Sequence, residues 1–344
     1  MRWLRRSWPL VAAVAAVLVA AGISAVVLSA SPGRPGHRST GTTTANGVHS
    51  SRPRSSSPST STSPTTSSQP QSAPHLMVIV MENHGYAQII GSPTAPYLNA
   101  LAQRYGLATA SYATAHPSLP NYLELVSGST QGVTDDCTTC VANAPQIVDQ
   151  LQKAGIGWRA YMEAAPSSCF TGSAFPFDRH HDPFVYAPHI VDDPAECGRV
   201  VPFATFGSAL SDGTLPPFVW VTPDVEHDMH TGTVAEGDAW LRTTLSTVLS
   251  SAWYRDDGAV IVTFDESTGG TAAGCCTGAA GGHVVTLVVS SRTPHGARMS
   301  TPIDGAGILR TVEAIYGLPY LGAAANPKSG TLLPLVGLPR ARGG

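Results

Sequence analysis

Six short apolar segments, rich in valine and isoleucine, constrain the fold of this chain more than any other feature. They alternate with amphipathic stretches, and the sequence contains no internal repeat. Strands that are apolar on both faces are typical of a parallel sheet whose two faces are covered by helices. The alternation therefore predicts an α/β domain, a three-layer sandwich with a mainly parallel central sheet. The expected strands are 75–80, 107–114, 158–162, 218–221, 259–264 and 284–289, and the expected helices are 97–105, 120–126, 144–154, 237–250 and 307–316.

Polar side chains follow four of the predicted strands. In a parallel sheet, ligands gather outside the carboxyl ends of the strands, so residues at these positions are candidates for a functional site. A purely structural sheet has no need for carboxylates, histidines and a hydroxyl at one edge. The residues are Glu82 and Asn83 after the first strand, His116 and Ser118 after the second, Asp224, Asp228 and His230 after the fourth, and Asp265 and Glu266 after the fifth.

Asp265 and Glu266 are the clearest indication of a metal site. Two adjacent carboxylates repel each other unless a cation, a proton or a basic partner lies between them, and no lysine or arginine is near in sequence. A solvated turn is the alternative, because acidic pairs are common in turns. We favour a metal, because the preceding strand is strongly apolar and Glu82 and Asn83 end another strand in the same way.

Ser118 is the candidate nucleophile. It lies where the second strand gives way to a helix whose first turn contains Pro120. A helix amino end presents free N–H groups and a partial positive charge, which suit an incoming phosphate. A helix-capping serine is the commoner use of this residue type at such a position. The neighbouring acids favour the nucleophile, because contact with a metal lowers the pKa of a hydroxyl and activates it.

Three histidines in predicted loops complete the candidate site: His116, His181 and His230. A single histidine is more often structural than catalytic. Three histidines at one edge of the sheet favour phosphate binding or protonation of the leaving group. His283, before the sixth strand, is a weaker candidate.

Residues 1–30 have the pattern of a signal peptide or signal anchor. Three arginines in the first six residues precede an apolar run, from about Pro9 to Ala30, that contains no charge. A cleavable signal peptide has a shorter apolar region, whereas about 20 apolar residues span a bilayer. We therefore expect an exported chain, anchored in the membrane and facing outside, with its arginine-rich end in the cytoplasm. Cleavage near Ala30, which would give a secreted protein, is the alternative.

Residues 31–73 have the composition of a disordered linker, rich in serine, threonine and proline and without acids. Residues 74–344 form the predicted catalytic domain, of a size that buries a single large core. Seven of the 20 basic residues precede position 55, which leaves 13 basic and 23 acidic residues after it and a formal charge of −10. That charge argues against nucleic acid as a partner, since nucleic acid binds basic surfaces.

The six cysteines of this chain indicate disulfides rather than thiol chemistry, because the chain is expected to be exported. A Cys-x-x-Cys pair could also begin a zinc site, but no second pair follows at zinc-finger spacing. The expected local pairs are Cys137 with Cys140 and Cys169 with Cys197, whereas the adjacent Cys275 and Cys276 are harder to place.

Six short strings resemble, in order and spacing, the phosphoesterase family of bacterial acid phosphatases and phospholipases C. Each string alone is weak, but together they span almost all of residues 75–320, and the likeness includes the late segment 313–319. The strings are Met81-Glu82-Asn83-His84, His116-Pro117-Ser118-Leu119-Pro120-Asn121-Tyr122, His181-Asp182-Pro183-Phe184, Asp228-Met229-His230, Gly237-Asp238-Ala239-Trp240-Leu241 and Thr263-Phe264-Asp265-Glu266.

The resemblance implies an alkaline-phosphatase-like fold with a divalent metal ion in its site. Carboxylates and an amide accept Mg, Ca, Mn or Zn with modest preference, so the identity of the metal stays open. The residues that the resemblance assigns to the metal are Glu82, Asn83, Ser118, Asp265 and Glu266.

The resemblance also implies a two-step reaction. Ser118 attacks phosphorus in line and forms a phosphoserine, from which water later releases inorganic phosphate. Asn121 would bind a phosphate oxygen, and His181 and His230 would contact phosphate or protonate the leaving oxygen.

Two features depart from the family pattern. The family often carries a histidine just before its last helix, where this chain reads Ile303-Asp304-Gly305-Ala306, and His283 could compensate from a neighbouring loop. The stretch 269–282 is long and glycine-rich and holds the adjacent cysteines, so a lid or rim there could alter the choice of substrate.

We expect a phosphate monoester hydrolase that acts on small esters or phosphoinositide head groups. One rival is a phospholipase C type phosphodiesterase, which needs room for two substituents on phosphorus and usually an aromatic cage for choline. A second rival is a cell-envelope binding module that has lost the chemistry, and the intact set of Ser118 and acids argues against it. The aromatic residues available for a cage are Tyr112, Tyr122, Trp158 and Tyr186, which the sequence does not group.

Overall fold

The computed structural model describes residues 73–268, 274–276 and 278–338. The membrane-targeting segment predicted for residues 1–30 and nearly all of the linker predicted for 31–73 lie outside the described residues. Among the helices that the structure describes, none is long and apolar enough to cross a membrane.

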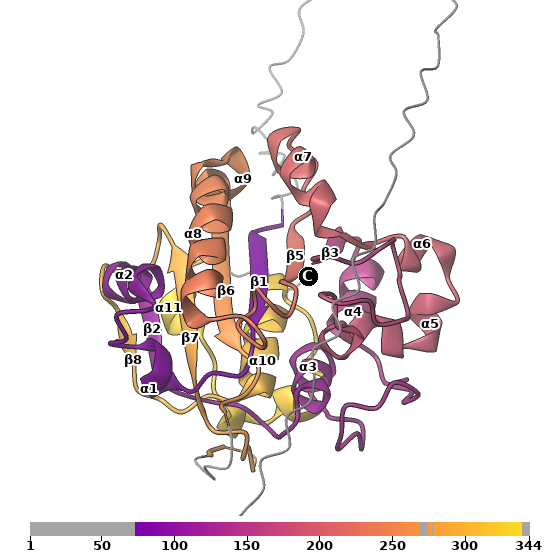
Figure 1. The fold of residues 1–344 in the computed structure, drawn as a ribbon, viewed down its shortest axis with the longest axis horizontal. Helices are drawn as coiled ribbons and strands as arrows, with labels where there is room; N and C mark the ends of the chain where they lie inside the picture. Colours follow the sequence, from indigo (N-terminus) through magenta and orange to yellow (C-terminus); the bar gives the residue numbers. More distant parts are fainter. Residues whose placement is uncertain (1–72, 269–273, 277, 339–344) are drawn as a thin grey trace, which may run out of the picture. The chain divides into compact units, whose positions relative to one another are not determined.

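One eight-stranded sheet forms the centre of the described chain (Figure 1). Its strand order is β4-β3-β5-β1-β6-β7-β2-β8. β7 runs antiparallel to both of its neighbours, and all other paired strands are parallel. The strands are β1 (His75–Met81), β2 (Gly106–Tyr112), β3 (Trp158–Met162), β4 (Val200–Pro202), β5 (Phe218–Thr222), β6 (Gly258–Phe264), β7 (His283–Ser290) and β8 (Arg298–Met299).

Helices cover both faces of the sheet, because alternate residues of the central strands point to opposite sides. Leu76, Val78 and Val80 of β1 pack in one core with α3 (Ser118–Ser127), α4 (Ile147–Lys153) and α10 (Gly305–Tyr316). Met77 and Ile79 pack in the other core with α2 (Pro96–Arg104), α8 (Val234–Ser250) and α9 (Ala252–Asp257). The predicted three-layer sandwich with a mainly parallel sheet is therefore confirmed.

The six predicted strands and five predicted helices are all present, with ends that differ by a few residues. The sequence did not indicate β4 and β8, because strands of three and two residues at the sheet edges are too short to show a pattern. Six short helices were not predicted: α1 (Tyr86–Ile89), α5 (Pro188–Val191), α6 (Pro194–Cys197), α7 (Phe206–Ser211), α9 and α11 (Leu333–Val336).

Three disulfides occur in the described part of the chain. The two expected local pairs, Cys137–Cys140 and Cys169–Cys197, are both formed. The remaining cysteines, Cys275 and Cys276, are bonded to each other.

Glu313 of α10 is a buried carboxyl whose ionisation opposes folding. Its Oε1 accepts a hydrogen bond of 2.8 Å from the Leu321 N–H, and its Oε2 has no hydrogen-bond partner. Burial raises the pKa of Glu313 to about 8, and the Leu321 N–H and Arg310 offset this only in part. The folded state therefore retains a proton that the unfolded state loses above about pH 4.5, so the stability contributed at this site falls between about pH 4.5 and 8.

Glu313→Gln should remove this pH dependence, since the amide oxygen can still accept from Leu321. We expect the variant to melt at a higher temperature than the wild type at pH 8 and at a similar temperature at pH 4. Between these pH values, the difference in the free energy of unfolding between the two proteins should grow by at most about 1.4 kcal/mol per pH unit. Thermal denaturation from pH 4 to 9 measures it, with exposed Glu226→Gln as the matched control. Parallel melting curves for Glu313→Gln and the wild type across this range would contradict the assignment.

Candidate active site

The carboxyl ends of β1, β2, β5 and β6 lie at the same edge of the sheet, because these strands are mutually parallel. Glu82 follows β1, Ser118 opens α3 after β2, and Asp265 follows β6. The residues predicted from the strand ends are thereby brought to one edge, although they are up to 183 positions apart in the chain.

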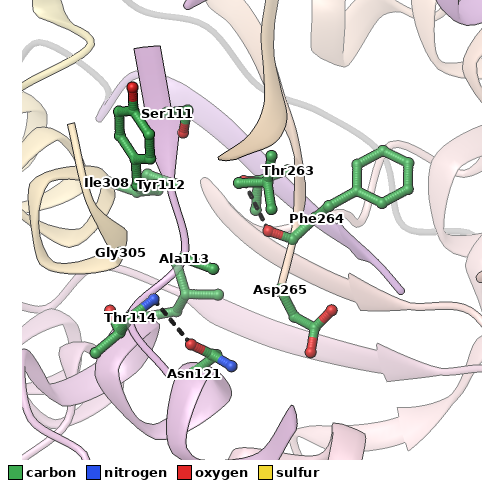
Figure 2. A pocket seen from close by; sticks show the side chains of 12 residues that line it. Ser111, Tyr112, Ala113, Thr114, Asn121, Thr263, Phe264, Asp265, Gly305 and Ile308 are labelled. Atoms are coloured by element: carbon green, nitrogen blue, oxygen red, sulfur yellow. Dashed lines mark hydrogen bonds between the residues drawn. The ribbon is translucent and has the colours of Figure 1, made fainter. Parts of the chain in front are cut away.

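Asp265 is the most unusual carboxylate at this edge. It is 2% exposed, and neither of its carboxylate oxygens has a hydrogen-bond partner. It lines a small cavity with Asn121, between β2, β6, α3 and α10 (Figure 2). A buried carboxylate without partners is costly unless a cation or a proton balances it.

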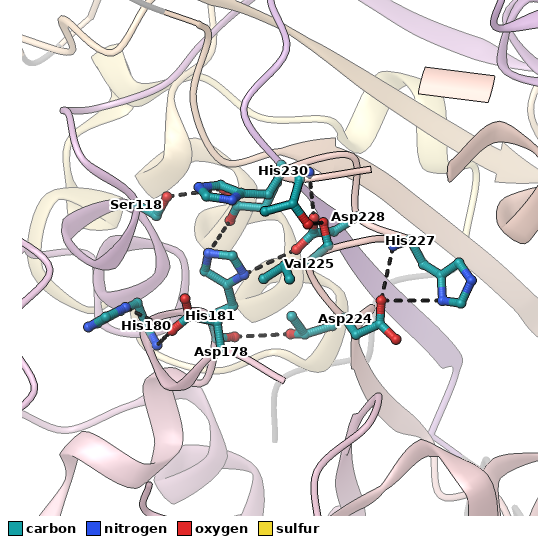
Figure 3. Close-up of polar contacts among 12 residues, drawn as sticks. Ser118, Asp178, His180, His181, Asp224, Val225, His227, Asp228 and His230 are labelled. Carbon is teal, nitrogen blue, oxygen red and sulfur yellow. Dashed lines mark hydrogen bonds and ion pairs between the residues drawn. The ribbon is translucent and has the colours of Figure 1, made fainter. Parts of the chain in front are cut away.

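Ser118 is hydrogen-bonded into a buried acid cluster (Figure 3). Its hydroxyl donates to Glu82 Oε2 at 3.0 Å. The other oxygen of Glu82 lies 3.3 Å from His181 Nε2, within ion-pair range but without hydrogen-bond geometry. Ser118, Glu82 and His181 are all at least 97% buried. The predicted nucleophile is therefore in direct contact with a predicted metal ligand.

Asp228 orients His181. Its Oδ2 lies 3.1 Å from His181 Nδ1, and its Oδ1 accepts a hydrogen bond of 2.7 Å from the His230 N–H. The His181 ring also stacks on Tyr122 at 5.3 Å. A carboxylate on one ring nitrogen fixes the direction of the other, so Nε2 of His181 is aimed at Glu82. The sequence placed Asp228 beside the site but gave no sign of this role.

The pKa values of the clustered acids are raised by their shared burial. Burial is the main cause for Glu82 and Asp265, and both carboxyls have a pKa well above the ordinary range. The Asp265 charge further raises the pKa of Glu82, and the Glu266 charge raises that of Asp265. Burial also raises the pKa of Asp228, while His181 lowers it. Four buried acids with so little counter-charge favour either bound protons or a bound cation.

These residues fit a divalent metal. Ligand atoms of Glu82, His181 and Asp228 lie within 4.8 Å of one another, and the two unpartnered oxygens of Asp265 lie at the same strand ends. Hard divalent cations prefer carboxylate oxygens. A metal would supply the positive charge that the surrounding side chains do not.

Glu266 and His116 form an ion pair at the rim of the cluster. Burial raises the pKa of Glu266, and the contact with His116 lowers it. His230 is exposed, and its ring packs edge-on against His181 at 5.6 Å. Asn83 follows Glu82 directly and is partly exposed.

Asn121 makes contacts that the sequence did not predict. Its side-chain oxygen accepts from the N–H groups of Thr114 and Ala115, at 3.0 and 2.9 Å. Its side-chain nitrogen donates to the carbonyls of Ala115 and Pro117, at 2.9 and 3.1 Å. Asn121 thus holds the loop that leads into Ser118, and its contact with phosphate stays a prediction.

A second polar cluster lies on the other side of the loop that carries Asp228 (Figure 3). Glu163 Oε2 accepts from the Asp224 N–H and lies 3.1 Å from His227 Nδ1, and its Oε1 accepts from Trp240 Nε1. Asp224, one of the residues noted at the strand ends, therefore belongs to this cluster.

His283 does not approach the cluster through any of its described contacts. Its ring is stacked between Tyr86 and Tyr112, at 4.3 and 5.2 Å. Its Nε2 bonds the Thr109 carbonyl at 3.0 Å, and burial lowers its pKa.

Two known phosphatases are similar to this chain in sequence. A phosphatidylinositol-3-phosphatase of Mycobacterium tuberculosis is 33% identical over 257 residues, covering 73% of this chain and 80% of that protein. A probable acid phosphatase of Kluyveromyces lactis is 28% identical over 257 residues, covering 71% of this chain and 58% of that protein. The chain thus spans most of the first relative and little more than half of the second.

The fold is shared with solved structures at low sequence identity. The phosphonate monoester hydrolase of Agrobacterium radiobacter aligns with a TM-score of 0.52 and 15% identity over 77% of each chain. At that identity the likeness concerns the fold alone, and it agrees with the expected three-layer sandwich. The model of the Phosphoesterase family matches residues 92–319, which include most of the strand ends described above. This match, together with the 33% identity to the mycobacterial relative, shows that the chain belongs to the Phosphoesterase family.

Proposed function

We propose that this chain is a metal-assisted hydrolase of phosphate monoesters that works through a phosphoserine at Ser118. The observation that carries the proposal is the hydrogen bond from the Ser118 hydroxyl into the buried acid cluster, beside the unpartnered carboxylate of Asp265. A plain helix cap would not need four carboxylates buried around it.

Relatives support the monoester class. The two relatives described above are named as a phosphatidylinositol phosphatase and an acid phosphatase, and both act by name on phosphate monoesters. We extend the proposal to small phosphate esters and phosphoinositide head groups as substrates of this chain.

The residues proposed to hold the metal are Glu82, Asn83, Asp265 and Glu266, with the Ser118 oxygen adjacent. A divalent ion bound there supplies positive charge that favours the ionised hydroxyl and balances the charge of the phosphoryl group in transfer.

The other residues of the site position the reacting groups. Ser118 stands at the amino end of α3, a ten-residue helix whose partial positive charge favours a phosphate. Asn121 fixes the loop before Ser118 through four hydrogen bonds. Asp228 orients His181. We assign to His181 and His230, with His116 at the rim, the contact with phosphate or the protonation of the leaving oxygen.

The monoesterase is favoured over the phospholipase C type phosphodiesterase by the positions of the aromatic residues. Tyr122, Trp158 and Tyr186 are buried, and each stacks on a different neighbour, so the described residues form no aromatic cage from them. Tyr112 stacks on His283.

We also propose that the domain acts outside the cytoplasm, tethered to the membrane by residues 1–30 or secreted if that segment is cleaved. The paired cysteines support an oxidising compartment, because disulfides persist there.

The function is tested with the full chain, produced in an oxidising compartment. We expect turnover of p-nitrophenyl phosphate, little turnover of p-nitrophenyl phosphorylcholine, and loss of activity after chelation that added divalent metal restores. Preference for the phosphorylcholine ester would establish the phosphodiesterase instead. Turnover of neither ester from acid to alkaline pH, with Mg, Ca, Mn and Zn each supplied, would favour a binding module.

A further inference from the structure

Tyr122 is a buried tyrosine on the helix that carries Ser118, and the proposed reaction gives it no role. It is 0% exposed, and its hydroxyl has no hydrogen-bond partner. Other buried tyrosine hydroxyls in the described part of the chain also lack a partner, so this alone decides nothing. They belong to Tyr161, Tyr186 and Tyr254. What distinguishes Tyr122 is the acid cluster beside it.

The position of Tyr122 in α3 places it next to the candidate site. It follows Ser118 by four residues, so the two side chains lie on the same face of the helix. Its ring stacks on the His181 imidazole, with 5.3 Å between the ring centroids and 8° between the planes. Both neighbours contact Glu82, because the Ser118 hydroxyl donates to its Oε2 at 3.0 Å and His181 Nε2 lies 3.3 Å from its Oε1. Tyr122 thus lies against the two residues that flank this carboxylate.

An unused donor and an unused acceptor lie in this cluster. Neither the Tyr122 hydroxyl nor Glu82 Oε1 has a hydrogen-bond partner. Burial is the main reason that the pKa of Glu82 is raised, and the nearby hydroxyls of Tyr122 and Ser118 act in the opposite direction. Burial also raises the pKa of Tyr122, and the charges of Glu82 and Asp265 raise it further, as expected of a hydroxyl that faces the cluster. Two hydroxyls of one helix therefore face Glu82, and that of Ser118 is the one with hydrogen-bond geometry.

The proposed reaction removes the donor that Glu82 now has. Once Ser118 carries the phosphoryl group, its ester oxygen has no hydrogen to donate, and an ionised Ser118 oxygen cannot donate either. A buried carboxylate that loses its donor is costly. Carboxylates that ligate a metal are held in place by hydrogen bonds from neighbouring groups. The Tyr122 hydroxyl is an unused donor at the place where Glu82 then needs one.

We propose that Tyr122 is a positioning residue: its hydroxyl donates a hydrogen bond to Glu82 when Ser118 no longer does, and so keeps this carboxylate oriented as a metal ligand. The inference rests on the proposed function and adds a supporting residue to the same site. Tyr122 transfers no proton, because its hydroxyl keeps its own hydrogen throughout. Its ring, stacked on His181, fixes the direction from which the hydroxyl approaches.

The test compares the wild type with Tyr122→Phe, which keeps the ring and removes only the hydroxyl. Calorimetry measures the affinity for whichever of Mg, Ca, Mn and Zn the wild type binds most tightly. This affinity should fall about 10- to 100-fold, the usual effect of removing a group that supports a metal ligand. At saturating metal, kcat for p-nitrophenyl phosphate should fall about tenfold or more, with little change in KM. Without metal, the variant should melt at the same temperature as the wild type or a higher one, because a buried hydroxyl without a partner is removed.

Tyr161→Phe is the matched control. Tyr161 lies on β3, is 0% exposed, and also has a hydroxyl without a hydrogen-bond partner. It packs in the core on the opposite face of the sheet from Tyr122. The control should therefore keep the metal affinity and the kcat of the wild type.

The outcomes separate this inference from the proposed function, because metal binding and melting are measured without turnover. Equal metal affinity in Tyr122→Phe and the wild type would overturn the inference and leave the proposed function intact. A lowered melting temperature without metal, together with weaker metal binding, would assign the Tyr122 hydroxyl a structural role instead. Weaker metal binding by Tyr122→Phe, in a chain that binds metal but hydrolyses no ester, would support the inference and contradict the proposed function. A wild type that binds none of the four ions would overturn both.

Discussion

Replacing Ser118 with alanine should abolish phosphate ester hydrolysis, with kcat falling by about four to six orders of magnitude, as for other covalent nucleophiles. The side chain removed is the hydroxyl that donates to Glu82 at 3.0 Å, and within the described site it is the hydroxyl held directly in the acid cluster. Since Ser118 is 3% exposed and a methyl group fits the same space, folding should be retained. Steady-state assays with p-nitrophenyl phosphate measure the loss.

A trapping experiment distinguishes loss of the nucleophile from a general disturbance. The wild type quenched in acid during turnover of a labelled phosphate ester should carry label on Ser118, and Ser118→Ala should carry none. Ser208→Ala, an exposed serine on α7, is the matched control and should keep both the activity and the label. Full activity in Ser118→Ala would assign the reaction to another nucleophile.

The central strands of the sheet were predictable because a strand that is buried on both faces has a mostly apolar sequence. Residues 259–264 are apolar at every position except Thr263, and β6 is buried along its whole length between β1 and β7. The same rule fails for β4, a three-residue edge strand that ends in a proline. The hydrophobic pattern of the sequence therefore predicted the central strands of the sheet and missed the short edge strands.

The candidate site was predictable only as a set of strand ends. Each polar residue follows the carboxyl end of its strand, and parallel pairing brings these ends, with Glu82 and Asp265, to one edge of the sheet. The partner of each side chain does not follow, since the Glu82 contact with His181 joins residues 99 positions apart through an irregular segment. The same limit hid the role of Asp228.

The division of one loop between two clusters was equally invisible in the sequence. Asp224 and Asp228 are four positions apart, yet Asp224 bonds the N–H groups of Glu226 and His227, and Asp228 faces His181. The directions in which these two side chains point depend on the backbone turns of the loop, which the sequence does not show. As a result, one short segment supports the candidate site on one side and contacts Glu163 on the other.

Asp265→Asn should remove most of the metal affinity together with the activity, and should change stability in opposite directions with and without metal. The amide has nearly the shape of the carboxylate but removes one charge from a site where buried acids repel each other. Without metal the variant should melt at a higher temperature than the wild type, because ionising a buried unpartnered carboxylate opposes folding. With metal the wild type should gain several degrees, as binding at about 1,000 times Kd contributes about 4 kcal/mol, and the variant should gain little.

Melting curves with chelator and with each of Mg, Ca, Mn and Zn measure this crossover, and they do not depend on turnover. Asp256→Asn, an exposed acid on α9, is the matched control and should behave as the wild type in both conditions. A hundredfold or greater loss of kcat in Asp265→Asn, at saturating substrate and metal, should accompany the lost metal response. A variant that keeps the full metal-dependent gain would remove Asp265 from the ligand set. A wild type that shows no gain with any of the four ions would leave the buried acids to be balanced by protons, and the reaction would then have to proceed at acidic pH without a metal.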